Sequence, residues 1–362
     1  MAESEPAPST RDALVRPPAC ATTGIGDLPH TDAREAVSAV FDRHPDLPYW
    51  PQLPKRSARE GMIGQFLGRF PFLQYRRPTP RLSVEGDSPE MKDVLERIAA
   101  GDPEMAPPPL GIAEAGGWHA LLEHIEGLPA EDRPAVVKGQ LTGPVSGTSL
   151  ACDVRGTSLM QFPGYLTAIS TYLGGIGVHQ CETLRELGCQ PLIVLDEPML
   201  HGVNPEEDEA AIEAMVTTIS ALLERLRAAG ALTAIHCGGA MAWPLYFKLP
   251  VDWISFDVPL ALESLRGHAD SLLAWIAAGR GLSLGVVPTS RFEDDYDPEA
   301  EADRIVEQLT AFLGSFTDVR TLLGRAIISA ASGTMTQPIE KDERIATAVD
   351  QVARRLRESA AD

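Results

Sequence analysis

The chain has 362 residues, of which 44% are hydrophobic and 23% charged, which is the composition of a globular protein and excludes global disorder. Its formal net charge of −20 at pH 7 argues against nucleic acid or an anionic membrane as a partner. No apolar run reaches the roughly 20 residues of a membrane-spanning helix, and the N-terminus lacks a basic segment followed by an apolar one, so we expect a cytoplasmic location.

The first predicted elements are short. Residues 1–18 are rich in Ala, Pro, Ser and Glu, and we expect a disordered tail before a single domain at 19–362. A strand is predicted at 20–25, followed by a helix that Thr31 and Asp32 cap and that ends at Phe41. Residues 45–57 contain four prolines, which predicts an irregular segment that either connects elements on the surface or takes part in substrate binding.

Beyond this segment, short apolar strands alternate with longer helices. The predicted strands are 72–75, 135–139, 192–195, 232–235, 253–256, 282–287 and 326–329. The predicted helices are 90–99, 156–187, 205–229, 260–278, 298–313 and 341–358. Together with the strand at 20–25, this alternation predicts a (β/α)8 TIM barrel of eight parallel strands. An open doubly wound sheet is the alternative, but no GxGxxG or GxxxxGK[ST] motif precedes a helix.

The five cysteines are scattered, and no two of them form a CxxC pair. This spacing does not predict a disulfide framework, so we expect buried free thiols. Cys237 is singled out because it follows His236 where an apolar strand reaches two glycines. The other cysteines are Cys20, Cys152, Cys181 and Cys189.

Polar residues follow most of the predicted strands, at the ends where a barrel carries its active site. We predict catalytic roles for His236, Asp196 and Glu197. The predicted substrate-binding residues are Lys138, Gln140, Thr142, Asp257, Thr289 and Ser332. A metal site is considered at His236 and Cys237, two residue types that bind metals.

The chemistry of this set suits a small molecule. Lys138 and Gln140 can hold an anionic or amide-bearing ligand, and a carboxylate at 196 or 197 can bind an amine or take a proton. Side chains of neighbouring strand residues point to opposite faces. We therefore expect one residue of each adjacent pair, Asp196 with Glu197 and His236 with Cys237, to face the pocket.

Five segments of the chain resemble one superfamily. They are 23–57, VKGQLTGPVS at 137–146, LDEPML at 195–200, IHCGGAMAW at 235–243 and GVVPT at 285–289. The chain is similar in them to the superfamily of cobalamin-independent methionine synthase and uroporphyrinogen decarboxylase, above all to the methionine-synthase branch. The resemblance implies a barrel enzyme that transfers a methyl group from methyltetrahydrofolate or a methyl-corrinoid to a thiol that zinc activates. It also implies that Asp196 holds the acceptor's amino group, and that a corrinoid protein is a partner.

The zinc motif departs from the family pattern. The family has His-x-Cys at this strand end, whereas here Gly238 stands at the position of the cysteine. A second family cysteine falls on Ser332, and a family glutamate corresponds approximately to Asp257. Zinc binding would then depend on Cys237, brought inward by the Gly238-Gly239 turn.

These departures leave three functions open. The first is a methyltransferase-like enzyme that uses a small amine-bearing or thiol acceptor. The second is a non-catalytic relative that binds a folate, a corrinoid or an amino acid. The third is a uroporphyrinogen decarboxylase-like lyase, which needs arginines near the N-terminal rim and finds only a poor match in Arg56, Arg76 and Arg77.

Overall fold

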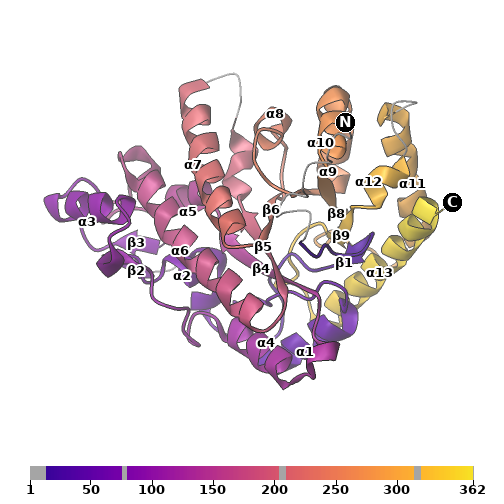
Figure 1. Cartoon of the computed structure of the whole chain (residues 1–362), viewed down its shortest axis with the longest axis horizontal. Helices are drawn as coiled ribbons and strands as arrows, with labels where there is room; N and C mark the ends of the chain where they lie inside the picture. Colours follow the sequence, from indigo (N-terminus) through magenta and orange to yellow (C-terminus); the bar gives the residue numbers. More distant parts are fainter. Residues whose placement is uncertain (1–13, 76–79, 204–208, 314–318, 362) are drawn as a thin grey trace, which may run out of the picture.

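The central sheet is parallel and lies inside a layer of helices (Figure 1). The computed structural model describes residues 14–75, 80–203, 209–313 and 319–361. The seven strands of the central sheet are β1 (Ala21–Thr22), β4 (Val136–Thr142), β5 (Gln190–Asp196), β6 (Leu232–Cys237), β7 (Trp253–Asp257), β8 (Gly281–Val287) and β9 (Ile327–Ala330). They are ordered β1-β9-β8-β7-β6-β5-β4, so each strand from β4 to β9 lies beside the next one in the chain. This order is that of a TIM-barrel-like sheet, not that of a doubly wound one.

The prediction of eight barrel strands is wrong for the segment 72–75. In the structure, β2 (Leu73–Tyr75) pairs antiparallel with β3 (Pro80–Leu82) in a separate two-stranded sheet. In β3, Pro80 and Leu82 are buried whereas Arg81 between them is exposed. Such alternation is typical of a sheet with one covered face, while a barrel strand is buried on both faces.

The proline-rich segment closes the gap between β1 and β4, the two edge strands of the sheet, and we call its residues 48–52 the closing segment. Tyr49 forms a parallel bridge with Lys138 of β4, and Gln52 forms one with Asp27, beyond the end of β1. The Trp50 N–H donates to the Lys138 carbonyl at 3.0 Å, and the Gln52 N–H donates to the Gly26 carbonyl at 2.9 Å. Prolines have no N–H to donate, which limits the ladder to isolated bridges.

The helices surround this sheet. Their bounds are α1 (Ala33–Arg43), α2 (Met62–Leu67), α3 (Pro89–Ala99), α4 (Gly116–Gly127), α5 (Pro144–Leu150), α6 (Tyr165–Glu186), α7 (Glu209–Ala228), α8 (Trp243–Tyr246), α9 (Val258–Leu265), α10 (Ala269–Ala277), α11 (Pro298–Leu313), α12 (Val319–Leu323) and α13 (Ile339–Ala361). Asp32 caps α1, as predicted. The helix predicted at 156–187 begins only at Tyr165, and the one predicted at 260–278 is divided into α9 and α10. None of the helices within the described residues is both long and apolar enough to cross a bilayer.

An apolar layer fills the interior of the sheet near the N-terminal ends of its strands. Its members come from the inner faces of the strands and from one loop: Ala21, Leu47, Val136, Leu192, Val194, Leu232, Ala234, Trp253 and Ile327. Leu14 packs against this layer, and Arg16 lies 5.2 Å from the centre of the Trp253 ring. Both residues fall in the predicted tail, whose first 13 residues lie outside the described part of the chain. Polar chemistry inside the sheet is therefore confined to the region beyond this layer.

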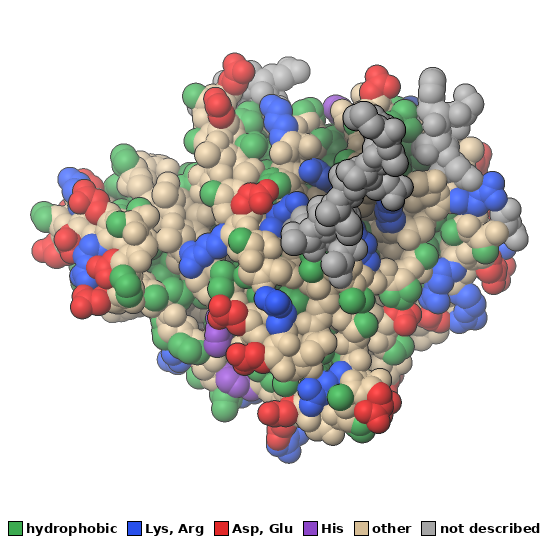
Figure 2. Space-filling model, viewed as in Figure 1, with side chains coloured by type: hydrophobic (Ala, Val, Ile, Leu, Met, Phe, Trp, Pro, Cys, Tyr) green, Lys and Arg blue, Asp and Glu red, His purple; other side chains and the backbone are tan. Residues whose placement is uncertain are grey.

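The surface carries charges of both signs. On the face shown in Figure 2, lysine and arginine side chains are interspersed with aspartate and glutamate side chains and form no large basic patch. Many arginines there and elsewhere are paired, such as Arg34 with Glu123 at 3.0 Å. Exposed pairs of this kind contribute little to stability, typically about 0–1 kcal/mol each.

Candidate functional site

A small cavity lies inside the sheet, above the apolar layer. We call it the barrel cavity. It is lined by Thr23, Gly24, Ile25, Lys138, Leu192, Val194, Asp196, Ala234, His236, Ser255, Ser283, Ile327 and Ser329.

Lys138 is the cation of the barrel cavity. It stands on the inner face of β4, where its Nζ donates to the Ile25 carbonyl at 2.6 Å and to Gln140 Oε1 at 3.4 Å. The same atom lies 5.4 Å from the centre of the Tyr49 ring. Burial lowers the pKa of Lys138 to about 8, although the charges of Asp196 and Asp27 oppose this change.

Asp196 and His236 face the cavity from neighbouring strands and are register partners. Asp196 Oδ1 is buried without a hydrogen-bond partner. Burial raises the pKa of Asp196 to about 7 against the opposing effect of Lys138. His236 Nδ1 lies 3.0 Å from Ser255 Oγ, and burial lowers the pKa of the ring to about 4, so the imidazole is neutral at pH 7. The cavity thus combines a carboxyl group whose pKa is near 7, which can give or take a proton at neutral pH, with an uncharged imidazole.

Glu197 points away from the barrel cavity, contrary to its predicted catalytic role. Its two carboxylate oxygens accept the N–H groups of Val145 and Ser146 at 2.9 and 2.7 Å, at the N-terminus of α5. A β-carbon at Gly143 would lie only 2.1 Å from Glu197 Cδ, so the close approach requires glycine there. The segments VKGQLTGPVS and LDEPML are therefore held together by this carboxylate. Burial raises the pKa of Glu197 to about 7 despite these bonds.

Cys237 also points away from the barrel cavity. It is completely buried in the outer core, where the Tyr246 hydroxyl is its neighbour, and burial raises the pKa of the thiol. Strand alternation explains the direction, since Cys237 follows inward-facing His236 as the last residue of β6.

The residues present do not fit the zinc ion that the resemblance implies. A β-carbon at Gly238, where the family has a cysteine, would lie 3.7 Å from His236 Nε2, but glycine offers no ligand. Asp257 Oδ1 accepts the Leu260 N–H at 3.1 Å and caps α9. Within the described residues, no three His, Cys, Asp or Glu side chains are grouped as metal ligands would be. We derive no step through a metal.

The other predicted binding residues have structural partners. Gln140 contacts Lys138 and donates from Nε2 to the Trp50 carbonyl at 3.3 Å, so it holds the lysine and the closing segment together. Thr142 Oγ1 donates to the Met62 carbonyl at 2.6 Å. Thr289 and Ser332 hydrogen-bond to each other through their hydroxyls. None of these four residues lines the barrel cavity.

Several cavity residues were not predicted from the sequence. Ser255, Ser283 and Ser329 line the barrel cavity from three successive strands. Each is the only hydroxyl in a mainly apolar strand, at an inward position of the two-residue period. An isolated hydroxyl at an inward-facing strand position was the feature of the sequence that could have identified these three residues. Thr23 also lines the cavity, and its hydroxyl is buried without a partner.

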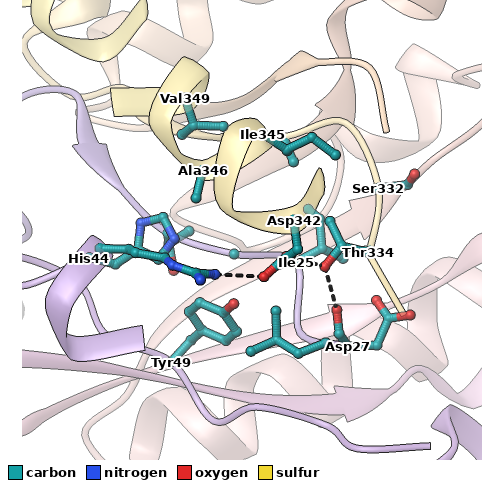
Figure 3. Close-up of a pocket in the computed structure, with 16 residues that line it drawn as sticks. Ile25, Asp27, His44, Tyr49, Ser332, Thr334, Asp342, Ile345, Ala346 and Val349 are labelled. Carbon is teal, nitrogen blue, oxygen red and sulfur yellow. Dashed lines mark hydrogen bonds and ion pairs between the residues drawn. The ribbon is translucent and has the colours of Figure 1, made fainter. Parts of the chain in front are cut away.

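A second cavity, which we call the side cavity, lies between β1 and the helices α1 and α13 (Figure 3). His44 and Tyr49 border it opposite Ile345 and Val349 of α13. The Arg43 guanidinium pairs with Asp342 at 2.6 Å, and Thr334 Oγ1 donates to the other oxygen of Asp342, also at 2.6 Å. The polar groups of this cavity are thus largely paired with one another. Residues 23–25 line both cavities and separate them.

No protein-family model matches the chain, and no curated protein sequence is significantly similar to it. Among solved structures it is similar to a D-psicose 3-epimerase with D-tagatose from Clostridium cellulolyticum H10, with a TM-score of 0.37 and 10% identity over 77% of this chain and 95% of that chain. The catalytic domain of a GH26 endo-beta-1,4-mannanase from Bacillus sp. JAMB-750 has a TM-score of 0.25 and 10% identity over 64% of this chain and 77% of that one. Likeness at this level carries no argument about activity, so the function must be argued from the barrel cavity itself.

Proposed function

We propose that this chain is a methyltransferase that moves a methyl group from methyltetrahydrofolate or a methyl-corrinoid to a small acceptor, amine-bearing or thiol, in the barrel cavity. The observation that most supports it is the Asp196 carboxylate, whose Oδ1 is buried in that cavity without a partner. A buried polar atom in this state costs free energy until a ligand supplies a donor. The amine of an acceptor is such a donor. The choice of methyl transfer rests on the sequence resemblance.

The chemistry of Asp196 favours an amine as the methylated group. As the new N–C bond forms and the donor's bond to the methyl group breaks, the amine must release a proton. A carboxylate whose pKa is raised to about 7 can hold the substrate amine and then take that proton. Neutral His236, fixed by Ser255, offers its other ring nitrogen for a hydrogen bond to the acceptor.

A thiol acceptor is the less favoured form of the proposal. A free thiol has a pKa near 8.5 and is mostly neutral at pH 7, so it needs a cation or a metal to become a nucleophile. The donor set beside His236 does not fit zinc, and the carboxylate of Asp196 faces the same space. Negative charge there raises the pKa of a bound thiol further.

The experiment is a calorimetric titration of the full chain with methyltetrahydrofolate and with methylcobalamin, followed by transfer assays with labelled donor and a panel of small amines and thiols. We expect one donor to bind and an amine to be methylated. Asp196→Asn should lower the transfer rate by on the order of 100-fold. Asp46→Asn, which changes an exposed aspartate, is the matched control. Failure of both donors to bind would contradict the proposal.

A non-catalytic carrier is the competing function, and the missing zinc ligands at Gly238 and Ser332 favour it. His236→Ala separates the two possibilities. An enzyme should lose turnover in this variant while it still binds the donor. Donor binding by the wild-type chain without turnover of any acceptor would instead identify a carrier.

A further inference from the structure

The hydrogen bonds of Lys138 match a neutral amine. Its Nζ contacts two uncharged oxygens, the Ile25 carbonyl at 2.6 Å and Gln140 Oε1 at 3.4 Å. An ammonium has three N–H donors, whereas a neutral amine has two N–H donors and one lone pair. The two acceptors therefore satisfy the neutral form, while an ammonium would have only the face of the Tyr49 ring, 5.4 Å from Nζ, as a further partner. The remaining position on nitrogen is then a lone pair.

The surroundings of Lys138 also favour loss of its proton. The side chain is buried, and a buried ammonium is stabilised only weakly by uncharged oxygens. The ionisable groups around it are Asp196 on β5, His236 on β6, Asp27 beyond β1, His44 after α1 and Tyr49 in the closing segment. The two carboxylates act against deprotonation and burial acts for it, which leaves the pKa of Lys138 at about 8.

The barrel cavity supplies the other groups that imine formation needs. Asp196 lines the cavity together with Lys138, and its free Oδ1 can carry a proton to a leaving hydroxyl. Ser255, Ser283 and Ser329 offer hydroxyls to a polar ligand. The carboxylate disfavours anionic ligands, so a neutral hydroxylated molecule fits best.

We propose that Lys138 forms a reversible imine with a small neutral hydroxyaldehyde or hydroxyketone in the barrel cavity. The lone pair of Nζ attacks the carbonyl carbon as the C=O π bond breaks, and one proton passes from the nitrogen to the oxygen to give a carbinolamine. Protonated Asp196 then donates its proton to the hydroxyl, which leaves as water while the C=N bond forms. The Asp196 carboxylate finally takes the remaining proton from the nitrogen. Overall, an amine and a carbonyl compound give an imine and one water. This activity needs no methyl donor and does not depend on the proposed methyl transfer.

The experiment traps the imine in the wild-type chain with dihydroxyacetone and sodium cyanoborohydride at pH 8. The reductant adds hydride to the C=N carbon and leaves a stable secondary amine, which peptide mass mapping locates. The chain has internal controls in its exposed lysines Lys55, Lys92 and Lys248. An exposed lysine with a pKa near 10.4 is less than about 1% neutral at pH 8, so we expect Lys138 to react at least about tenfold faster than each control.

Two further measurements test the origin of this selectivity. In urea, all lysines become equivalent and the preference for Lys138 should disappear. Asp196→Asn should slow trapping at Lys138 by about tenfold or more and leave the exposed lysines unchanged. The proposal is overturned if the folded chain reacts at Lys138 no faster than at Lys55, Lys92 or Lys248. Lys138→Gln is not required, so the result does not depend on whether that variant folds.

Discussion

The inner and outer faces of the strands differ sharply where β5 and β6 end. On the inner face, Asp196 Oδ1 has no hydrogen-bond partner, and Nδ1 of His236 is hydrogen-bonded to the Ser255 hydroxyl. On the outer face, the adjacent Glu197 has both oxygens bonded to backbone amides, and Cys237 is packed in the core. Residues that are neighbours in the sequence therefore lie in different environments, one in the barrel cavity and the other in the outer core. Unsatisfied polar atoms, more than residue type, distinguish the two faces.

The largest effect on the free energy of unfolding is expected at Glu197. Glu197→Ala leaves the amides of Val145 and Ser146 buried without an acceptor, and should lower the free energy of unfolding by about 3 kcal/mol or more. Urea denaturation measures this loss. Glu186→Ala, at an exposed glutamate of α6, should change it by less than about 0.5 kcal/mol. Equal effects of the two substitutions would show that the outer carboxylate is not structural.

The inner carboxylate should behave in the opposite way. The pKa of Asp196 rises from 3.8 to about 7 on folding, so the folded state binds this proton more tightly. Its contribution to stability is present below about pH 4 and is lost as the pH rises through about 7. Asp196→Asn should therefore be more stable than wild type at pH 8 by on the order of 1–3 kcal/mol, and this stability difference should be smaller at pH 5.

Urea unfolding of both proteins at the two pH values gives this difference. Asp46→Asn, at an exposed position, should show no comparable change with pH. If the stability difference between Asp196→Asn and wild type is the same at pH 5 and pH 8, Asp196 is not the strained group that we describe.

A smaller effect is expected at Cys237. Cys237→Ala removes a buried sulfur beside Tyr246 and should cost about 1–2 kcal/mol of stability. Because the thiol points away from the barrel cavity, imine trapping at Lys138 and binding of a methyl donor should be unchanged. The measurements are urea denaturation, peptide mapping and calorimetry. Metal analysis of the purified protein completes the test, since zinc that is present in wild type and absent in Cys237→Ala would mean that the thiol turns inward.

The sequence predicted the repeated part of the fold well. The runs at 135–139, 192–195, 232–235, 253–256, 282–287 and 326–329 all lie within or overlap strands of the parallel sheet, because strands buried on both faces are continuously apolar. The closing segment at 48–52 was not predicted as part of the sheet wall. Its prolines interrupt the apolar pattern and the hydrogen-bond ladder alike.

The site was predicted only in part, for a physical reason. Lys138, Asp196 and His236 do meet in the barrel cavity, as expected of strand-end residues. Strand alternation predicted that one residue of each adjacent pair faces inward, but it did not identify which one. The serines were missed because a single hydroxyl in an apolar strand is a weak signal. Only the structure shows that they line the same cavity as Lys138.

The closing segment is joined to the rest of the barrel wall by few backbone hydrogen bonds, and we call this join the seam. Elsewhere around the wall, neighbouring strands pair over two to seven residues, whereas residues 48–52 are joined to either side by one isolated bridge. Local opening in proteins begins where few backbone bonds must break together. The seam adjoins Lys138 directly, through the Trp50 amide and the Lys138 carbonyl. Opening the seam would nonetheless expose the Trp50 side chain, which is fully buried against Phe66 and Trp118. Apolar packing, more than the backbone ladder, therefore keeps the barrel wall closed beside the lysine.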